Sequence, residues 1–290
     1  MAKRTPKWNK ELRNTIFSKL CWIGVLVIAC YIVLGTSINY HINANTISSY
    51  EKTIENFSQE DIEAALKKAY AYNDLLYQTM GISVSELSSE LYNEAYYESL
   101  LNITGTSIMG RIEIPKIAVD LPIYHGTGDD ALSNGAGHLQ GSSLPVGGNN
   151  TRAVLSAHRG LPNAKLFTRL DELKEGDFVF IDVLNKKLAY RVIEITVVDP
   201  NDASILQIIP EQDLLSLVTC TPYGINTQRL IVTCARVEYN ELEKNSIQKA
   251  LPSVREAIIS YILPALIFLI SVYQVFQYSK KAKTRRERRK

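Results

Sequence analysis

Hydrophobic positions change their spacing along the 290-residue chain, and each spacing predicts a different kind of element. Residues 20–38 and residues 257–276 are apolar runs that contain no charged residue. Nineteen residues of helix rise about 28 Å, which is close to the thickness of the hydrocarbon core of a bilayer. Both runs are therefore predicted to be transmembrane helices. Pro264 in the second run is tolerated better in a membrane helix than in a soluble one.

Residues 39–107 show the spacing of helices. The string Ser58-Gln59-Glu60-Asp61 resembles a capping box, and Ile62, Leu66 and Ala69 then recur at helical intervals. The segment is rich in tyrosine, which is more typical of a packing surface than of a binding site, and it contains no obvious catalytic residue. We expect an extracellular helical segment that serves as a spacer, as a lid over the following domain, or as both.

From residue 108 the apolar runs become short and are separated by Gly, Pro and Asn, which is typical of β-strands. At least seven strands are predicted, at residues 110–115, 118–123, 153–156, 178–183, 188–198, 214–219 and 230–237. One helix is expected near residues 164–173, and the Gly- and Ser-rich residues 132–148 predict a loop or a short helix. Residues 108–240 are therefore predicted to form a mainly β domain, a closed or nearly closed β-barrel, followed by a linker at residues 241–256.

Charge is distributed unevenly, with basic residues concentrated at both ends of the chain. Residues 1–19 and residues 277–290 contain 14 of the 32 Lys and Arg residues, which leaves a formal charge of −10 in the middle. The positive-inside rule therefore places both termini in the cytoplasm and the acidic middle outside the cell membrane. The first span has no clear Ala-x-Ala cleavage site, so we expect it to be retained. The basic C-terminal tail directly borders an apolar span, which favours a stop-transfer role and contact with membrane lipid over nucleic-acid binding.

The four cysteines fall into two groups. Cys21 and Cys30 lie in the first predicted span, where a thiol is usually a small apolar group. Cys220 and Cys234 lie in the predicted barrel, and an extracellular pair invites a disulfide. If the runs around them form a hairpin, Cys234 lies five residues, or roughly 16 Å, beyond the position opposite Cys220, which exceeds disulfide reach. Cys234 is therefore expected to be a small buried residue.

Cys220, His158 and Arg229 are the candidate catalytic residues, because each lies at the end of a predicted strand. A thiol attacks a carbonyl only as the thiolate, which a nearby imidazole and guanidinium both favour. His158 can protonate a leaving amine, and Arg229 suits the binding of substrate or the stabilisation of an oxyanion. Such a set forms an acyl-enzyme from an amide; water as the acceptor gives a protease and an amine gives a transpeptidase. A cysteine, a histidine and an arginine in a sheet domain can also be purely structural.

The remaining motifs indicate no cofactor. His125 and His138 are the competing histidines, and each is expected to be a hydrogen-bonded structural residue. No pair of His, Cys or acidic residues has zinc-like spacing, and the sequence contains no glycine-rich phosphate loop. We therefore expect neither a cofactor nor a bound metal.

Several longer strings occur in a fixed order and are more specific together than any single short motif. They are Ile112-Glu113-Ile114-Pro115-Lys116-Ile117, Leu121-Pro122-Ile123-Tyr124-His125-Gly126-Thr127, Gly137-His138-Leu139, Gly141-Ser142-Ser143-Leu144-Pro145, Leu155-Ser156-Ala157-His158-Arg159-Gly160-Leu161-Pro162, Leu166-Phe167-Thr168 and Leu217-Val218-Thr219-Cys220-Thr221-Pro222-Tyr223-Gly224. Through them residues 110–237, almost half of the chain, resemble a sortase, and in particular the pilus-assembling group called class C. The second span and its basic tail fit this group as well.

The resemblance implies an eight-stranded sortase-type β-barrel with short helices. It implies Cys220 as the nucleophile, His158 as the general acid and base, and Arg229 as the residue that holds the substrate and the oxyanion. The implied reaction cleaves a Leu-Pro-x-Thr-Gly-like sorting signal of a pilin or surface protein between Thr and Gly. The acyl group then passes to a lysine amine of another pilin, and no cofactor is needed.

Three features depart from the family pattern. Pilus sortases usually carry an Asp-Pro-aromatic lid motif before the barrel, whereas the pair Asp199-Pro200 of this chain lies inside the predicted barrel. No residue is therefore assigned to plugging the site. Gln228 stands where the family often has histidine, and Thr233-Cys234 stands where Arg-Gly is common. The last two changes leave the three candidate residues intact.

Two alternatives stay open on the sequence. A housekeeping sortase would attach surface proteins to the peptidoglycan precursor, although the second span and the string Thr221-Pro222-Tyr223-Gly224 argue against it. A non-catalytic membrane scaffold on the same fold would leave Cys220 unreactive.

Overall fold

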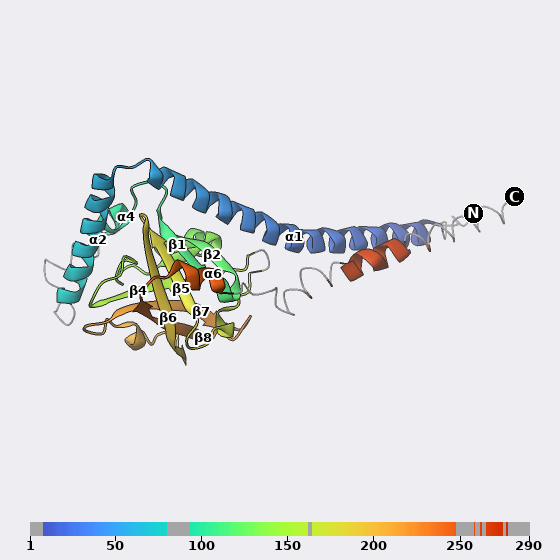
Figure 1. The fold of residues 1–290 in the computed structure, drawn as a ribbon. Coiled ribbons are helices and arrows are strands. Elements are labelled where there is room, and N and C mark those ends of the chain that lie inside the picture. Colours follow the sequence, from blue (N-terminus) through green and yellow to red (C-terminus); the bar gives the residue numbers. More distant parts are fainter. Residues whose placement is uncertain are drawn as a thin grey trace, which may run out of the picture. The chain divides into compact units, whose positions relative to one another are not determined.

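The computed structural model describes residues 8–79, 93–161 and 164–247, together with 258, 262, 265–274 and 277 (Figure 1). The chain divides into two compact units. One comprises Met1–Ser37 and Pro252–Lys290, and the other comprises Ile38–Leu251. The second unit holds the eight described strands and the three candidate catalytic residues.

The eight strands form a closed barrel in the order β1-β2-β3-β4-β7-β8-β6-β5. They are β1 (Ile108–Ile114), β2 (Val119–His125), β3 (Ala136–His138), β4 (Thr151–Ser156), β5 (Phe178–Val183), β6 (Lys186–Val198), β7 (Asp213–Thr221) and β8 (Gln228–Val237). Strands β2 and β3 pair in parallel, as do β4 and β7, and the other neighbours are antiparallel. The predicted mainly β, eight-stranded barrel with short helices is confirmed.

Side chains alternate between the two faces of each strand, and those on the inner face form one hydrophobic core inside the barrel. Ala153 and Leu155 of β4 belong to this core, as do Leu215 and Leu217 of β7. Residues between them face the other side of the sheet, since successive side chains of a strand point to opposite faces. Cys220 is an odd number of residues from Leu215 and Leu217, so it lies on the outer face of the barrel wall.

Three described helices precede the barrel: α1 (Trp8–Glu55), α2 (Gln59–Thr79) and α4 (Glu94–Ser99). The side-chain oxygen of Ser58 accepts a hydrogen bond from the backbone N–H of Asp61 at 3.1 Å, which confirms the predicted cap of α2. Ile62 and Ala69 of α2 are buried in the same core as the barrel strands. The described part of the tyrosine-rich segment therefore packs against the barrel, and Figure 1 shows α2 and α4 beside it.

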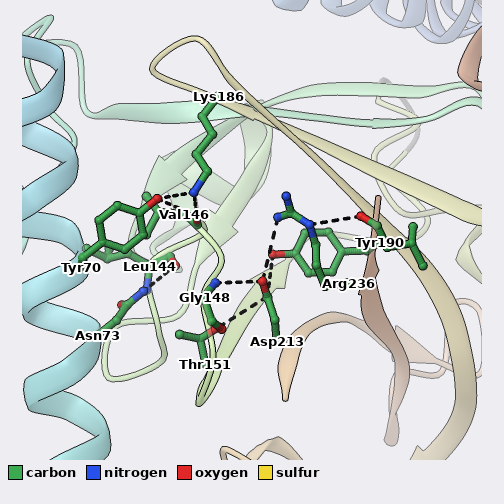
Figure 2. A network of polar contacts seen from close by, with 11 residues as sticks. Tyr70, Asn73, Leu144, Val146, Gly148, Thr151, Lys186, Tyr190, Asp213 and Arg236 are labelled. Atoms are coloured by element: carbon green, nitrogen blue, oxygen red, sulfur yellow. Dashed lines mark hydrogen bonds and ion pairs between the residues drawn. The ribbon is translucent and has the colours of Figure 1, made fainter. Parts of the chain in front are cut away.

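Polar contacts fasten α2 to the loop that precedes β4 (Figure 2). The buried side chain of Asn73 accepts a hydrogen bond from the Leu144 N–H at 2.7 Å and donates one to the Leu144 carbonyl at 3.2 Å. The ammonium of Lys186 donates to the Val146 carbonyl at 2.9 Å and to the hydroxyl of Tyr70. These contacts satisfy the Leu144 N–H and the Val146 carbonyl of this loop.

Asp213, the first residue of β7, is the centre of a second network in Figure 2. Its carboxylate accepts hydrogen bonds from the Gly148 N–H at 2.8 Å and from the Tyr190 hydroxyl at 2.9 Å. The Thr151 hydroxyl donates to it at 3.4 Å, and the Arg236 guanidinium lies 3.9 Å away. Because Thr151 begins β4, this carboxylate ties the start of β4 to the start of β7 and so supports their register.

One local prediction is wrong, and a second is only partly right. The expected helix near residues 164–173 is a turn followed by a single 3-10 turn at Leu170–Glu172, since the local hydrogen bonds there span three residues. Residues 132–148, predicted as a loop or a short helix, contain the end of the short helix α5 (Asp129–Asn134) but also the strand β3, which was not predicted. A strand of three residues is too short to show an alternation of apolar and polar residues. The strand β3 is held by its pairing with β2 and β4.

In the described parts of the chain, no helix is both long enough and apolar enough to cross a membrane. The first predicted span, residues 20–38, falls within α1, and residues 257–276 are described only in part. The helix α6 (Glu241–Ser246) begins the predicted linker, and the rest of that linker from residue 248 lies outside the described residues. So do residues 1–7, 80–92 and 278–290. The two spans stay predictions from the sequence.

Candidate active site

Strands β7 and β8 place Cys220 and Arg229 directly opposite each other. The two strands are antiparallel neighbours, and Cys220 is the register partner of Arg229. Directly opposite residues on such a pair have Cβ atoms about 4.5–5.5 Å apart and share one face of the sheet. Both side chains are half-buried, so they are open to a substrate. The predicted hairpin is confirmed.

The parallel pairing of β4 with β7 brings His158 to the same end of the barrel wall. Ser156 is the register partner of Val218, so His158, two residues later, comes level with Cys220. Beyond the end of β4 the contact continues: the Ala157 N–H donates to the Val218 carbonyl at 3.2 Å. The Thr219 hydroxyl donates to the Ala157 carbonyl at 2.8 Å. The three predicted residues therefore converge at the adjoining ends of β4, β7 and β8, although 62 residues separate His158 from Cys220.

Arg159, which the sequence reasoning did not single out, ties the loop of His158 to the loop after Cys220. Its buried guanidinium donates to the Thr221 hydroxyl at 3.1 Å and forms an ion pair with Asp171. It also lies 5.9 Å from the centre of the Tyr223 ring. Gly160 packs against the same ring, since a Cβ at this position would lie 3.2 Å from it. The only signal in the sequence was the position of Arg159 directly after the candidate histidine.

The guanidinium of Arg229 is turned toward its own loop. It donates to the Gln228 carbonyl at 3.1 Å and to the Asn226 carbonyl at 3.4 Å. Neither acceptor is charged, so Arg229 keeps an uncompensated positive charge beside the thiol among the described residues. That charge suits the holding of an oxyanion.

Cys234 is the other cysteine of the barrel, and it is a core residue. Its register partner on β7 is Leu215, five positions from Cys220, and both cysteines are free. Cys234 is fully buried, and this burial raises the pKa of its thiol. A buried thiol with a raised pKa is unreactive, so Cys220 is the thiol of the barrel that can act as a nucleophile.

His125 and His138 are structural, as predicted, because their ring nitrogens are occupied by the fold. In His138, which is fully buried, Nδ1 lies 2.9 Å from the Tyr97 hydroxyl and Nε2 lies 2.9 Å from the Ser143 carbonyl. In His125, Nε2 lies 2.6 Å from the Leu100 carbonyl. These contacts fasten α4 and the following loop to the barrel. Among the described residues, no group of three or more His, Cys, Asp or Glu residues is placed to hold a metal ion.

The buried imidazole of His138 predicts a loss of stability in acid. Burial lowers its pKa from 6.5 to about 4, so the unfolded chain binds more protons between these values. Its contribution to stability is complete above pH 6.5 and is lost as the pH falls toward 4. Between pH 7.5 and pH 5 we expect this group to reduce the free energy of unfolding by about 2 kcal/mol.

Urea unfolding followed by near-ultraviolet circular dichroism measures this effect. His138→Gln should be less stable than the unaltered protein at pH 7.5, because it breaks the contacts with Tyr97 and Ser143. Its stability should depend less steeply on pH over the same interval. Equal slopes for the two proteins would contradict the assignment.

A family model described as the Sortase domain matches residues 112–237. The match begins in β1, ends with β8 and includes all three candidate catalytic residues. It therefore spans the barrel wall on which those residues converge.

Solved structures of sortase C proteins are similar over about two thirds of the chain. Sortase C1 from Streptococcus agalactiae is 41% identical, with a TM-score of 0.63, and the match covers 68% of this chain and 100% of that one. The structure of Clostridium perfringens sortase C with the C-terminal cell wall sorting motif is 43% identical, with a TM-score of 0.57, over 68% and 100% of the chains. Streptococcus pneumoniae sortase C, described for its catalysis and pilin substrate specificity, is 38% identical, with a TM-score of 0.58, over 67% and 97%.

Proposed function

We propose that this chain, which belongs to the sortase family of cysteine transpeptidases, joins pilin subunits to one another at the outer face of a Gram-positive cell membrane. The observation that carries the proposal is the register that brings Cys220, His158 and Arg229 to one end of the barrel wall. Similarity to sortase C proteins supports a pilin as the substrate. The resemblance of the strings around His158 and Cys220 to class C sortases supports the same substrate class.

In the first half of the proposed reaction, Cys220 attacks a Leu-Pro-x-Thr-Gly-like signal. The Cys220 thiolate adds to the carbonyl carbon of the Thr residue, and the oxyanion that forms is stabilised by Arg229. His158 then protonates the amine of Gly as the carbon–nitrogen bond breaks. The C-terminal fragment leaves, and the rest of the pilin stays on Cys220 as a thioester.

In the second half, the ε-amine of a lysine on another pilin attacks the thioester. His158 removes a proton from this amine as the new carbon–nitrogen bond forms, and the carbon–sulfur bond breaks. The products are an isopeptide bond between two pilins and a free Cys220 thiolate. Neither half consumes a cofactor, an oxidant or a reductant.

The proposed location is supported by the two uncharged apolar runs and by the basic residues beside them. Residues 20–38 and 257–276 would cross the membrane, with both basic tails in the cytoplasm and in contact with lipid. The acidic middle, which contains the barrel, would then face the cell exterior. This topology would place Cys220 on the side of the membrane where pilins are assembled.

An acceptor competition tests the proposed function. The full-length chain in detergent is incubated with a Leu-Pro-x-Thr-Gly peptide, and intact mass should reveal an adduct of the acyl half. Two acceptors are then offered together: a pilin peptide with a free lysine side chain, and a peptide whose only amine is its N-terminal amine. We expect the lysine peptide to discharge the adduct faster, and acetylation of its lysine to abolish this transfer.

Other results would support the alternatives. Faster transfer to the N-terminal amine would favour a housekeeping sortase that attaches surface proteins to the peptidoglycan precursor. An absence of any adduct, together with a Cys220 that does not react with an alkylating reagent, would favour a non-catalytic membrane scaffold.

A further inference from the structure

Arg152 on β4 is a buried cation with an incomplete set of partners. Its side chain is on the outer side of the barrel wall, since its neighbour Ala153 faces the core, and the residue is only 3% exposed. One guanidinium nitrogen donates to the Ser216 hydroxyl at 2.8 Å, and Nε has no hydrogen-bond partner. Among the described residues, no carboxylate forms an ion pair with Arg152. Burying such a charge is costly unless a partner compensates it.

The same arginine lines a cavity of about 300 Å³. The cavity lies against β4 and is bounded by α2, by the loop after β3 and by the loop between β6 and β7. Its apolar lining includes Leu76, Leu139, Val154, Leu206 and Ile208. No acidic side chain is among the described lining residues, so Arg152 is the charged group of this cavity. An apolar pocket with one buried cation suits a ligand that is mostly apolar and carries one anionic group.

The cavity lies along the outer face of the sheet from Cys220. Ser216, which holds the guanidinium, is four residues before Cys220 on β7, and both residues point to the same face. Four residues of extended chain span about 13 Å. Consider an extended peptide whose Thr carbonyl is bound to Cys220 and which runs along β7 toward Ser216. The residue four positions before that Thr would then lie at the guanidinium of Arg152. In a Leu-Pro-x-Thr-Gly signal, that residue is the one directly before Leu.

We propose that Arg152 selects sorting signals that carry Asp or Glu directly before the Leu residue. The carboxylate would pair with the guanidinium, whose Nε has no hydrogen-bond partner. Burial lowers the pKa of Arg152, and the charge of Glu194 opposes this shift only in part. A substrate carboxylate would supply the missing compensation. The inference rests on the proposed function, because it takes the acyl half of the signal as the occupant.

Matched peptides test this selectivity. Three peptides differ only in the residue before Leu, which is Glu, Gln or Lys, and the rate of Cys220 acylation in the full-length chain is followed by intact mass. We expect kcat/KM for the Glu peptide to exceed that for the Gln peptide by about tenfold, and the Lys peptide to be slowest. Moving Glu two residues further from Leu should remove the advantage.

Variants separate selection from a purely structural role. Arg152→Met should bring the ratio of the Glu and Gln rates to about one, whereas Arg152→Lys, which keeps the charge, should retain part of the preference. Arg191→Met removes an exposed cation of β6 that does not line the cavity, so it should keep the full ratio. Circular dichroism checks that each variant is folded.

Three outcomes would overturn the inference, and they can be told apart. A ratio near one in the unaltered protein, with all three peptides acylating Cys220, would refute selection by Arg152 while leaving the transpeptidase intact. So would a ratio that Arg152→Met does not change. Failure of every peptide to acylate Cys220 would refute the proposed function itself and, with it, the basis of this inference.

Discussion

Cys220→Ala is expected to abolish both the acyl-enzyme and its transfer to a lysine amine. The proposed intermediate is a thioester, and alanine has no atom that can form it. The cross-strand partner Arg229 and the neighbouring His158 would remain in place but without a nucleophile, so no residual route through an acyl-enzyme exists. We expect a loss of more than about a thousandfold, measured by intact mass with the peptide and by gel analysis of pilin polymers.

Cys234→Ala is the matched control for this experiment. Both cysteines belong to the β7–β8 hairpin, yet Cys234 is fully buried in the core and points away from the outer face. Removing its sulfur should reduce stability by about 1 kcal/mol and leave acylation intact. In the folded protein an alkylating reagent should modify Cys220 and spare Cys234. An adduct that persists in Cys220→Ala would assign the chemistry to another residue.

His158→Gln is expected to lower the rate of acylation by about 10²- to 10⁴-fold. Glutamine keeps a polar side chain of similar reach but cannot donate a proton to the leaving amine of Gly. It also cannot take a proton from Cys220 or from the attacking lysine. The rate is measured in single turnovers with excess enzyme, so that acylation is separated from transfer.

A change of leaving group distinguishes acid catalysis from a general disturbance of the site. A thioester analogue of the scissile bond expels a thiolate, which needs no protonation. The loss caused by His158→Gln should therefore be smaller with the thioester than with the amide. His125→Gln serves as the control, because His125 binds the Leu100 carbonyl and takes no part in the proposed reaction. Equal losses with both substrates would show that His158 does not act as the acid.

Much of the site could be predicted because local patterns mark strand ends. The apolar run before Cys220 and the run after Arg229 predicted a hairpin, and the register makes these two residues direct partners. The same hairpin placed Cys234 five positions away, in the core. His158 was found because it directly follows a short apolar strand. The pattern did not indicate which strand pairs with the strand before His158. The pairing of β4 with β7 joins residues about 62 positions apart in the chain.

Local structure was mispredicted where tertiary contacts outweigh the local preference of the sequence. Residues 164–173 have helical composition, yet their backbone forms only a turn and the 3-10 turn at Leu170–Glu172. There the Phe167 N–H donates to the His158 carbonyl, and Asp171 pairs with Arg159. These contacts hold the loop of His158, and the positive φ of 40° at Leu166 interrupts a right-handed helix. The strand β3 was missed because three residues are too few to show an alternating pattern. Its strand conformation depends on pairing with β2 and β4.

By itself, the sequence determined seven of the eight strands in residues 108–240, the three candidate residues and the two uncharged apolar runs. Hydrophobic spacing, the ends of strands and the distribution of charge are local properties that can be read without the fold. Only the tertiary structure decided which face of the wall carries Cys220, that Arg159 joins the loops beside it, and that Arg152 is buried in a cavity on the same face. These features depend on which strands become neighbours. That choice is made by burial and pairing of residues far apart in the chain, and no local pattern records it.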